Sequence, residues 1–457
     1  MIGESGALRR AWGLLLDPAT PEKRRLLAER WEGLDPALRL PGQGLGQKAT
    51  GCGATVGVQP RCDFACTGCY LGQEANRIPA LGLPEVLAQI DELRRYLGPK
   101  SNVQITDGEV TLRPVEELVE ILRHARSIGA IPMVMTHGDQ LRLRPGLLER
   151  LMEEGGLTEV SIHVDITQRG RVGWKAPKSE LELMPLREEL ADLVRTARQR
   201  TGLPLRAATT LTITRQNLPQ VADVVRWTVR HRDAFSLISF QPLAQVGRTR
   251  KSLEGVTADE LWEEIGRATA GFGLVLESTG PLHFGHTDCT RFVPLLAVER
   301  RGETRLLQLI RDRPEDVAIM EELFASGLGG MAFRDDRPAE KVARGLGALG
   351  HAPGFFLNRV RRWAGRRLRE EIGVSLPGLL VEAVRGQARA GGLTLTSHHF
   401  MSPAELDTET GRERLAACVF RLPVDGEMVP MCSMNAGGIR EKLYAGIGRP
   451  ASFTPKH

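Results

Sequence analysis

Short apolar runs alternate with stretches of helical periodicity between about residues 53 and 271. Each run has the length of a buried strand, and turn residues bound it. Such alternation is typical of strand-helix units that repeat on a parallel sheet. We therefore expect strands at Ala54–Gln59, Asn102–Thr106, Pro132–Thr136, Glu159–Asp165, Leu205–Ile213 and Phe235–Gln241.

The helices between these strands are expected to pack one apolar face on the sheet. Helical spacing of apolar residues predicts helices at Leu83–Leu97, Val115–Ile128, Leu147–Glu154, Leu186–Arg200, Leu218–Arg230 and Leu261–Thr269. In parallel barrels the loops at the carboxyl ends of the strands gather the ligands. We expect the functional site at that edge.

The two flanking regions differ from this central part. Residues 1–50 are rich in charge and proline and predict an N-terminal helical extension, with helices at Arg9–Leu16 and Pro21–Leu34. After Gly271 the composition shifts toward glycine, arginine and loops. The predicted domains are therefore 1–50, the strand-helix units at 51–272 and a C-terminal domain at 273–457.

Composition excludes several classes of protein. The 61 basic and 56 acidic residues give a net charge of +5, which does not indicate nucleic acid, and 5% aromatic residues offer few platforms for bases. No run reaches the roughly 18 apolar residues of a membrane-spanning helix. Met1 to Asp17 lacks the apolar stretch of a signal peptide. We expect a cytoplasmic enzyme with no nucleic-acid partner.

A cysteine motif follows the first expected strand. Cys62, Cys66 and Cys69 have the spacing Cys-x3-Cys-x2-Cys. Three thiolates can hold three irons of a 4Fe-4S cube and leave the fourth iron open to a small molecule. A structural zinc site would need a second Cys or His pair at similar spacing, which does not follow. An odd total of seven cysteines without a signal peptide argues against a disulfide framework.

The spacing resembles the signature loop of the radical S-adenosylmethionine (SAM) superfamily. This resemblance implies an α/β fold with a partial (β/α)6 barrel, which the six expected units match. It implies that the open iron binds SAM, and that one electron from a donor such as flavodoxin or ferredoxin cleaves SAM to a 5′-deoxyadenosyl radical.

A second motif resembles the family's Gly-Gly-Glu strand. Asp107 stands in place of the first glycine, and Gly108 and Glu109 are retained. A carboxylate there can accept hydrogen bonds from an ammonium group, and a glycine lets the backbone approach the ligand. Before the last cysteine, where the family often has an aromatic residue, this chain has Gly68, and Tyr70 follows the motif.

Four further residues at the ends of the expected strands are cofactor contacts by resemblance. They are Thr136, Ser161, His163 and Thr212. The alternative is that they are inward barrel residues whose hydrogen bonds are satisfied within the protein.

The remaining cysteines are Cys52, Cys289, Cys418 and Cys432. Asp425-Gly426 is a hairpin signal that would bring Cys418 and Cys432 together across two strands. This hairpin resembles that of SPASM and Twitch auxiliary-cluster domains. The resemblance implies a second 4Fe-4S cluster with Cys289 as third ligand.

The completion of this second cluster stays open. Its fourth ligand could be a substrate, His286 or the pair His398-His399, or one iron could stay open. Cys52 lies just before the first strand, and we expect it at the bottom of the barrel, away from the others. The alternative for each cysteine is a buried apolar side chain.

The C-terminal half also resembles the tetraether lipid synthase group, through His398 to Met401, the segment from Cys418 to Cys432, and Asn435. Those enzymes join alkyl chains by abstracting hydrogen from unactivated methyl groups. The resemblance implies a transferase of lipid biosynthesis. This chain lacks the extra cysteines of archaeal members, so methylation or another radical alteration stays open.

Residues 355–369 combine six arginines with aromatic and aliphatic residues. A basic amphipathic helix can lie on an anionic membrane surface, so we expect a peripheral contact at the inner membrane face. The alternative is a solvated helix packed on the barrel. Leu376, Leu379, Leu380 and Val381 are expected to line an apolar passage for an alkyl tail.

Two rival functions remain. One is a peptide maturase that uses the same auxiliary hairpin. The other is a non-catalytic iron-sulfur carrier or scaffold, against which Glu109 argues because a carrier needs no group for the SAM amine.

Overall fold

The computed structural model describes residues 12–13, 15–16, 20–51, 53–277, 282–325 and 338–446. Cys52 and most of the helix expected at Arg9–Leu16 lie outside these residues. The other N-terminal prediction is confirmed by α2 (Pro21–Glu32), which a short 3-10 turn, η1 (Pro36–Leu38), follows.

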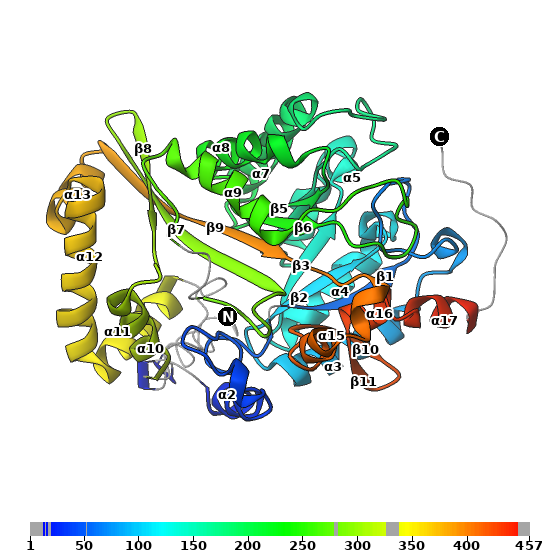
Figure 1. The fold of residues 1–457 in the computed structure, drawn as a ribbon, viewed down its shortest axis with the longest axis horizontal. Helices are drawn as coiled ribbons and strands as arrows, with labels where there is room; N and C mark the ends of the chain where they lie inside the picture. Colours follow the sequence, from blue (N-terminus) through cyan, green and yellow to red (C-terminus); the bar gives the residue numbers. More distant parts are fainter. Residues whose placement is uncertain are drawn as a thin grey trace.

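Six parallel strands in chain order form the centre of an 11-stranded sheet (Figure 1). They are β1 (Gly53–Gln59), β2 (Asn102–Asp107), β3 (Ile131–Thr136), β4 (Glu159–His163), β5 (Arg206–Ile213) and β6 (Phe235–Pro242). Each expected strand is present, with ends that differ by two residues or fewer. The α/β class with a mostly parallel sheet is therefore confirmed.

The connecting helices also match the expected ranges. They are α3 (Leu83–Leu97), α4 (Val115–Ser127), α6 (Leu147–Glu153), α7 (Met184–Thr201), α8 (Val221–Arg230) and α9 (Ala258–Ala270). Shorter elements are η2 (Ala75–Arg77), η3 (Val110–Leu112), α5 (Asp139–Leu143), η4 (Leu181–Leu183) and η5 (Leu218–Gln220). The apolar faces pack as the spacing predicts: Val86, Ile90 and Leu93 of α3 are fully buried with Val56 and Ile105 of the sheet.

Two strands of the C-terminal half extend the barrel sheet. Strand β9 (Ala388–His398) pairs in parallel with β6, and β10 (Phe420–Val424) pairs in parallel with β1. Beyond them lie β7 (Thr290–Arg300), β8 (Glu303–Gln308) and β11 (Glu427–Pro430), which pair antiparallel. The two halves thus share one sheet, and the boundary at 272/273 stays a prediction.

Strands β9 and β10, the outermost of the parallel strands, approach each other at one contact. The ring of His398, at the end of β9, contacts the ring of Phe420, at the start of β10, with centroids 4.9 Å apart. Because β9 and β10 lie at opposite edges of the eight parallel strands, this contact brings the two edges together.

The remaining helices lie at two ends of the molecule (Figure 1). One end has α10 (Pro314–Ala325), α11 (Pro338–His351), the π-helical turn η6 (Phe355–Val360), α12 (Arg361–Arg367), a second π-helical turn η7 (Leu368–Ile372) and α13 (Leu376–Val384). Beside β10 and β11 lie α15 (Glu409–Ala416), α16 (Met431–Asn435) and α17 (Ile439–Gly446), and α14 (Pro403–Leu406) precedes them in the chain.

Candidate functional site

A cavity of about 320 Å³ lies inside the ring of parallel strands. It contains every predicted cofactor-binding residue and the three loop cysteines. The residues brought together there are Cys62, Cys66, Cys69, Asp107, Gly108, Glu109, Thr136, Ser161, His163 and Thr212. Cys432 also lines it, whereas Cys289 and Cys418 are not among its lining residues.

The cysteine loop is held by two other loops that follow strands. The amide of Thr67 donates to the carbonyl of Thr167 after β4, at 2.8 Å. The amide of Cys69 donates to Thr249 Oγ1 after β6, at 3.1 Å, and Arg250 N donates to the carbonyl of Thr67 at 2.8 Å. The loop therefore has a defined conformation at the cavity.

The donor set fits an iron-sulfur cluster. Burial raises the pKa of Cys66 to about 12 and that of Cys62 well above its usual value. Thiolates bind metals, so loading a cluster must displace these protons. The guanidinium of Arg248 lies beside the three thiols and favours their negative charge. Three cysteines on one loop, facing a cavity and an arginine, suit a cube with one open iron.

The carboxylate of Glu109 is 1% exposed and bound by the protein's own donors. It accepts hydrogen bonds from Thr136 Oγ1 at 2.6 Å, from Thr111 Oγ1 at 2.5 Å and from the amide of His137 at 2.9 Å. Glu109 thereby fixes the end of β3. Its predicted contact with the SAM amine stays a prediction.

The side chain of Leu243 lies close to Gly68 of the cysteine loop. A Cβ at Gly68 would lie 2.8 Å from Leu243 Cδ1, and Leu243 itself lines the cavity. An aromatic side chain at 68 would need the space that Leu243 fills.

His163, which is partly exposed to the cavity, pairs with the buried Asp165 at the end of β4. His163 Nε2 lies 2.5 Å from Asp165 Oδ2, which also accepts the amide of Thr212 at 2.7 Å. Although burial opposes ionisation, His163 and these hydrogen bonds lower the pKa of Asp165 to about 2. Ser161 Oγ lies 3.1 Å from Thr210 Oγ1, so part of the polar interior is satisfied within the barrel.

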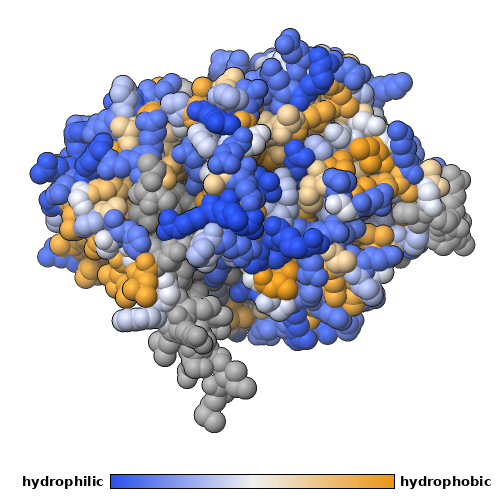
Figure 2. All heavy atoms as spheres, turned by 90° about the horizontal axis from the view of Figure 1, so that it is seen from below, coloured by the Kyte–Doolittle hydropathy of each residue, from blue (hydrophilic) through white to orange (hydrophobic). Residues whose placement is uncertain are grey.

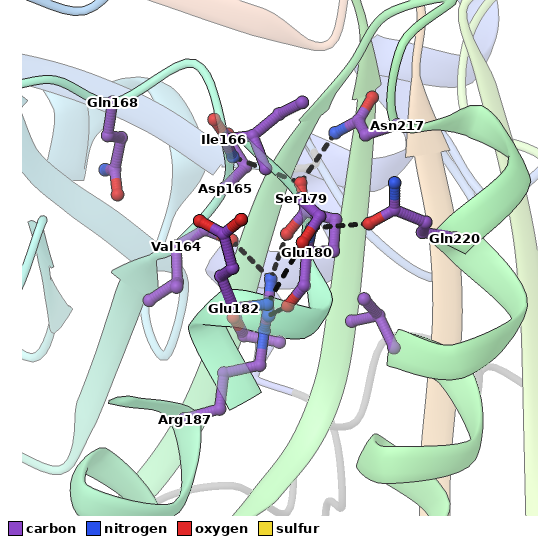
Figure 3. Close-up of polar contacts among 12 residues, drawn as sticks. Val164, Asp165, Ile166, Gln168, Ser179, Glu180, Glu182, Arg187, Asn217 and Gln220 are labelled. Carbon is purple, nitrogen blue, oxygen red and sulfur yellow. Dashed lines mark hydrogen bonds and ion pairs between the residues drawn. The ribbon is translucent and has the colours of Figure 1, made fainter. Parts of the chain in front are cut away.

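A second buried network supports the loops that carry this pair (Figure 3). Glu180 and Arg187 are each 1% exposed and form an ion pair. Glu180 Oε1 accepts the amide of Ile166 at 3.1 Å and the Asn217 side chain at 2.8 Å. Arg187 also donates to the carbonyl of Val164 at 3.0 Å. The network fixes the chain just before and just after Asp165.

The predicted hairpin is confirmed, but neither cysteine lies on its strands: Cys418 precedes β10, which begins at Phe420. Asp425 and Gly426 have φ of 50° and 83°, as a two-residue turn of this type requires, between β10 and β11. Strand β11 ends at Pro430, however, so Cys432 lies in helix α16 and not on the second strand. Proline at the N-cap of α16 ends strand pairing there.

Cys289, Cys418 and Cys432 are electrostatic neighbours. Burial raises the pKa of Cys418 to about 11 and of Cys432 to about 12, and the charge of Cys289 adds to both rises. Arg414 Nε lies 3.4 Å from Cys289 Sγ. The amide of Met401 donates to Cys432 Sγ at 3.4 Å. Each of these thiols is therefore within electrostatic range of another, outside the first loop, and we refer to the three as the second cysteine group.

The histidines proposed for this group differ in their surroundings. His398 lines the cavity, and burial lowers its pKa to about 4. His399 Nε2 lies 3.1 Å from Ser397 Oγ, and its amide donates to the carbonyl of Cys289 at 2.8 Å. The carbonyl of His286 accepts the amide of Cys289 at 3.0 Å. All three stay candidates.

Residues 56–226 match the model of the Radical SAM superfamily. That range holds the cysteine loop, Asp107 to Glu109 and most of the barrel strands. This segment is therefore similar to the domain of that superfamily, whose members use a 4Fe-4S cluster and SAM. The resemblances to auxiliary-cluster domains and to tetraether lipid synthases stay predictions.

Two solved structures are similar to part of the chain. Streptococcus suis SuiB has 14% identity and a TM-score of 0.36, over 48% of this chain and 46% of SuiB. Native anSMEcpe with bound AdoMet has 12% identity and a TM-score of 0.35, over 48% of this chain and 60% of that chain. The matches thus span about half of either protein. No curated protein matches the sequence.

Proposed function

We propose that this protein is a radical SAM enzyme that holds its cluster on Cys62, Cys66 and Cys69. The observation that carries the proposal is that these thiols line one cavity with Asp107, Gly108 and Glu109 inside the segment that is similar to the radical SAM domain. A cluster held by these cysteines and reduced by a donor such as flavodoxin or ferredoxin would supply one electron for the cleavage of SAM to methionine and a 5′-deoxyadenosyl radical, which would take a hydrogen atom from a C–H bond of the substrate.

The residues of this chain hold and shield the reactants. Thr136, Ser161, His163 and Thr212 offer polar groups along the strand ends for SAM. The contact between His398 of β9 and Phe420 of β10 joins the two edges of the cavity wall, and a closed wall would protect a radical from side reactions.

The substrate we propose is a lipid alkyl chain. Support comes from the part of the cavity near Cys432, where apolar side chains gather: Phe292, Phe400, Met401, Phe420 and Met431. Apolar walls with few polar groups suit an apolar substrate. The earlier expectation for Leu376, Leu379, Leu380 and Val381 is wrong in position, because none of them lines this cavity and Leu380 is 60% exposed.

The proposal includes a membrane contact through residues 355–369, made by fewer arginines than the six in the sequence. Arg359 pairs with Glu322, and Arg366 pairs with Glu315. Arg367 is buried, so three of the six arginines serve the protein itself. Arg361 and Arg369 each donate one hydrogen bond to a carbonyl of their own helical segment, and we propose that their other nitrogens, together with Arg362, bind anionic headgroups.

Exposed apolar residues lie close to these arginines in the chain. Val384 is 90% exposed, and Leu357, Leu380 and Val381 are also exposed. Figure 2 shows apolar surface at the end of the molecule that carries α12 and α13. None of the described helices is long and apolar enough to cross the bilayer, so the proposed contact is peripheral.

Vesicle binding tests this contact. Arg361→Glu with Arg362→Glu should weaken binding to anionic vesicles, in a salt-sensitive manner. The matched control is Lys175→Glu with Lys178→Glu, which makes the same charge change on an exposed loop of the barrel. Equal binding by both double variants would remove the membrane contact from the proposal.

The second cysteine group is proposed to hold an auxiliary 4Fe-4S cluster on Cys289, Cys418 and Cys432. Alanine at Cys62, Cys66 and Cys69 together should leave about four irons per chain. Further replacement of Cys418 and Cys432 by alanine should remove them. Trace iron in the first variant, with an unchanged fold, would make these cysteines packing residues.

Mass spectrometry of cells with and without the protein tests the substrate. We expect lipids or fatty acids with coupled or altered chain ends, and we expect their loss in the Cys66→Ala variant. Unchanged lipids together with a modified peptide would reject the lipid proposal and favour a peptide maturase.

A further inference from the structure

Asp107 has an unusual backbone conformation at the end of β2. Its φ is 122°, a region that favours glycine, and it is one of four non-glycine residues with positive φ in the described parts of the chain. Position 107 is also where the chain departs from the Gly-Gly-Glu pattern. A strained residue persists only where its surroundings over-determine it, and such sites cluster around ligands.

Arg440 of α17 supplies the partner of Asp107. Its NH1 atom lies 2.5 Å from Asp107 Oδ1, and its side chain is 4% exposed. The guanidinium also lies over the ring of Tyr70, 5.1 Å from the centroid. Tyr70 Oη in turn donates to the carbonyl of Asp107 at 2.5 Å. Asp107, which ends β2, and Tyr70, which follows the cysteine motif, therefore both contact one arginine.

Arg440 also links the end of β2 to the helix that carries Cys432 of the second cysteine group. Arg440 Nε donates to Asn435 Oδ1 at 3.0 Å, and Asn435 ends α16, which carries Cys432. Tyr444, one turn after Arg440, packs in an apolar cluster with Cys62 and Phe64. Helices α16 and α17 thus contact the cysteine loop, the end of β2 and the cavity.

The turn that Asp107 begins has little freedom. The amide of Gly108 donates to the carbonyl of Gln59 at 2.7 Å, and the amide of Glu109 donates to the carbonyl of Arg61 at 2.8 Å. Asp107 and Gly108 line the cavity. A shift at Asp107 would therefore move the backbone that faces the cofactor.

We propose that Arg440 is a positioning residue for SAM: its ion pair with Asp107 sets the turn at residues 107–109 and seats α16 and α17 against the site. This inference rests on the proposed function. Breaking a buried pair from one side leaves an uncompensated charge, whereas removing both partners relieves it. Glycine at 107 would also accept the positive φ without strain.

SAM binding to the reconstituted protein, measured by equilibrium dialysis, tests the proposal. We expect Arg440→Met to weaken SAM binding at least tenfold, and we expect Asp107→Gly in the same protein to restore most of it. Lys442→Met is the matched control, because Lys442 is an exposed cation on the same helix, and it should bind SAM as the wild type does.

Hydrogen exchange of the cluster-free protein gives a second measurement. Arg440→Met should speed exchange in residues 104–110 and 431–446, and not in α4. If Arg440→Met fails to fold, Arg440→Lys is used, and it should bind SAM more weakly than wild type because lysine lacks the second nitrogen contact to Asn435.

Two results would overturn the inference. One is wild-type affinity for SAM in Arg440→Met or, where that variant does not fold, in Arg440→Lys. The other is a loss that Asp107→Gly does not relieve, which would make Arg440 a purely structural residue. Absence of SAM binding by the wild-type protein would overturn the proposed function, and this inference with it.

Discussion

The imidazole of His137 lies flat against the ring of Phe64, with centroids 3.7 Å apart and planes 2° apart. His137 Nδ1 accepts the amide of Asp139 at 3.1 Å, so Nε2 carries the proton and donates to Asp63 at 2.8 Å. Burial opposes the ionisation of Asp63, but the contact with His137 works against burial and lowers the pKa of Asp63. His137 thus joins the end of β3 to the cysteine loop.

Loss of the contacts between His137 and the cysteine loop should make the cluster easier to remove. We expect His137→Ala to release iron to a chelator about tenfold faster or more, since a hydrogen bond to a charged group contributes about 1.5–3 kcal/mol. His137→Phe keeps the stacking alone and should fall between the alanine variant and wild type. His124→Ala, which removes a partly exposed pair between His124 of α4 and Asp91 of α3, is the control. Equal iron release by all four proteins would contradict this role.

Gly108 is predicted to tolerate no side chain. A Cβ there would lie 2.3 Å from the carbonyl oxygen of Arg61 and 2.4 Å from that of Pro60, and backbone atoms cannot move aside as side chains do. Gly108→Ala should therefore lower the free energy of unfolding by about 1–3 kcal/mol and abolish SAM binding.

The matched control for Gly108 is Gly266 in α9, where a Cβ would meet nothing within 4 Å. Gly266→Ala should stabilise the protein by about 0.5–1 kcal/mol, because alanine favours the helix. Denaturant unfolding measures both. A Gly108→Ala protein as stable as wild type, with normal SAM binding, would show that the turn can shift.

Lys23 predicts a pH dependence of stability. Its ammonium is buried in α2 and donates to the carbonyl of Leu97 at 3.0 Å and to Ser101 Oγ at 2.8 Å. Burial lowers the pKa of Lys23 to about 8. Between that value and the higher pKa of the unfolded chain, the unfolded state binds more protons. Below pH 8 the buried charged amine destabilises the folded state to its full extent, and this destabilisation is lost as the pH rises above 8.

Between pH 8 and 10 the free energy of unfolding of the wild-type protein should therefore increase relative to that of Lys23→Met. Denaturant titrations at several pH values measure this difference. An unchanged difference across that range would mean that the amine titrates as it does in water.

The six strand-helix units could be predicted because each buries a continuous apolar run, which is a local signal. The pairing of β9 with β6 and of β10 with β1 could not be predicted in this way. Long-range pairing depends on packing across the whole chain, and no local pattern fixes it. The helix at Cys432 had a local signal in Pro430, which the hairpin interpretation missed.

The cofactor loop was predictable because its three cysteines lie within eight residues. The contact between Arg440 and Asp107 joins residues 333 positions apart, and nothing in the spacing relates them. The sequence did indicate that Asp107 was unusual. The sequence did not indicate which residue would form an ion pair with Asp107.

The most direct test of the proposed function is the reductive cleavage of SAM. Protein reconstituted anaerobically with iron and sulfide is mixed with dithionite and SAM, and 5′-deoxyadenosine is measured by chromatography. The wild-type protein should form 5′-deoxyadenosine, and Cys66→Ala should form none and should lose the iron of the loop. A fully iron-loaded wild-type protein that forms no 5′-deoxyadenosine with any low-potential reductant would contradict the radical SAM function proposed here.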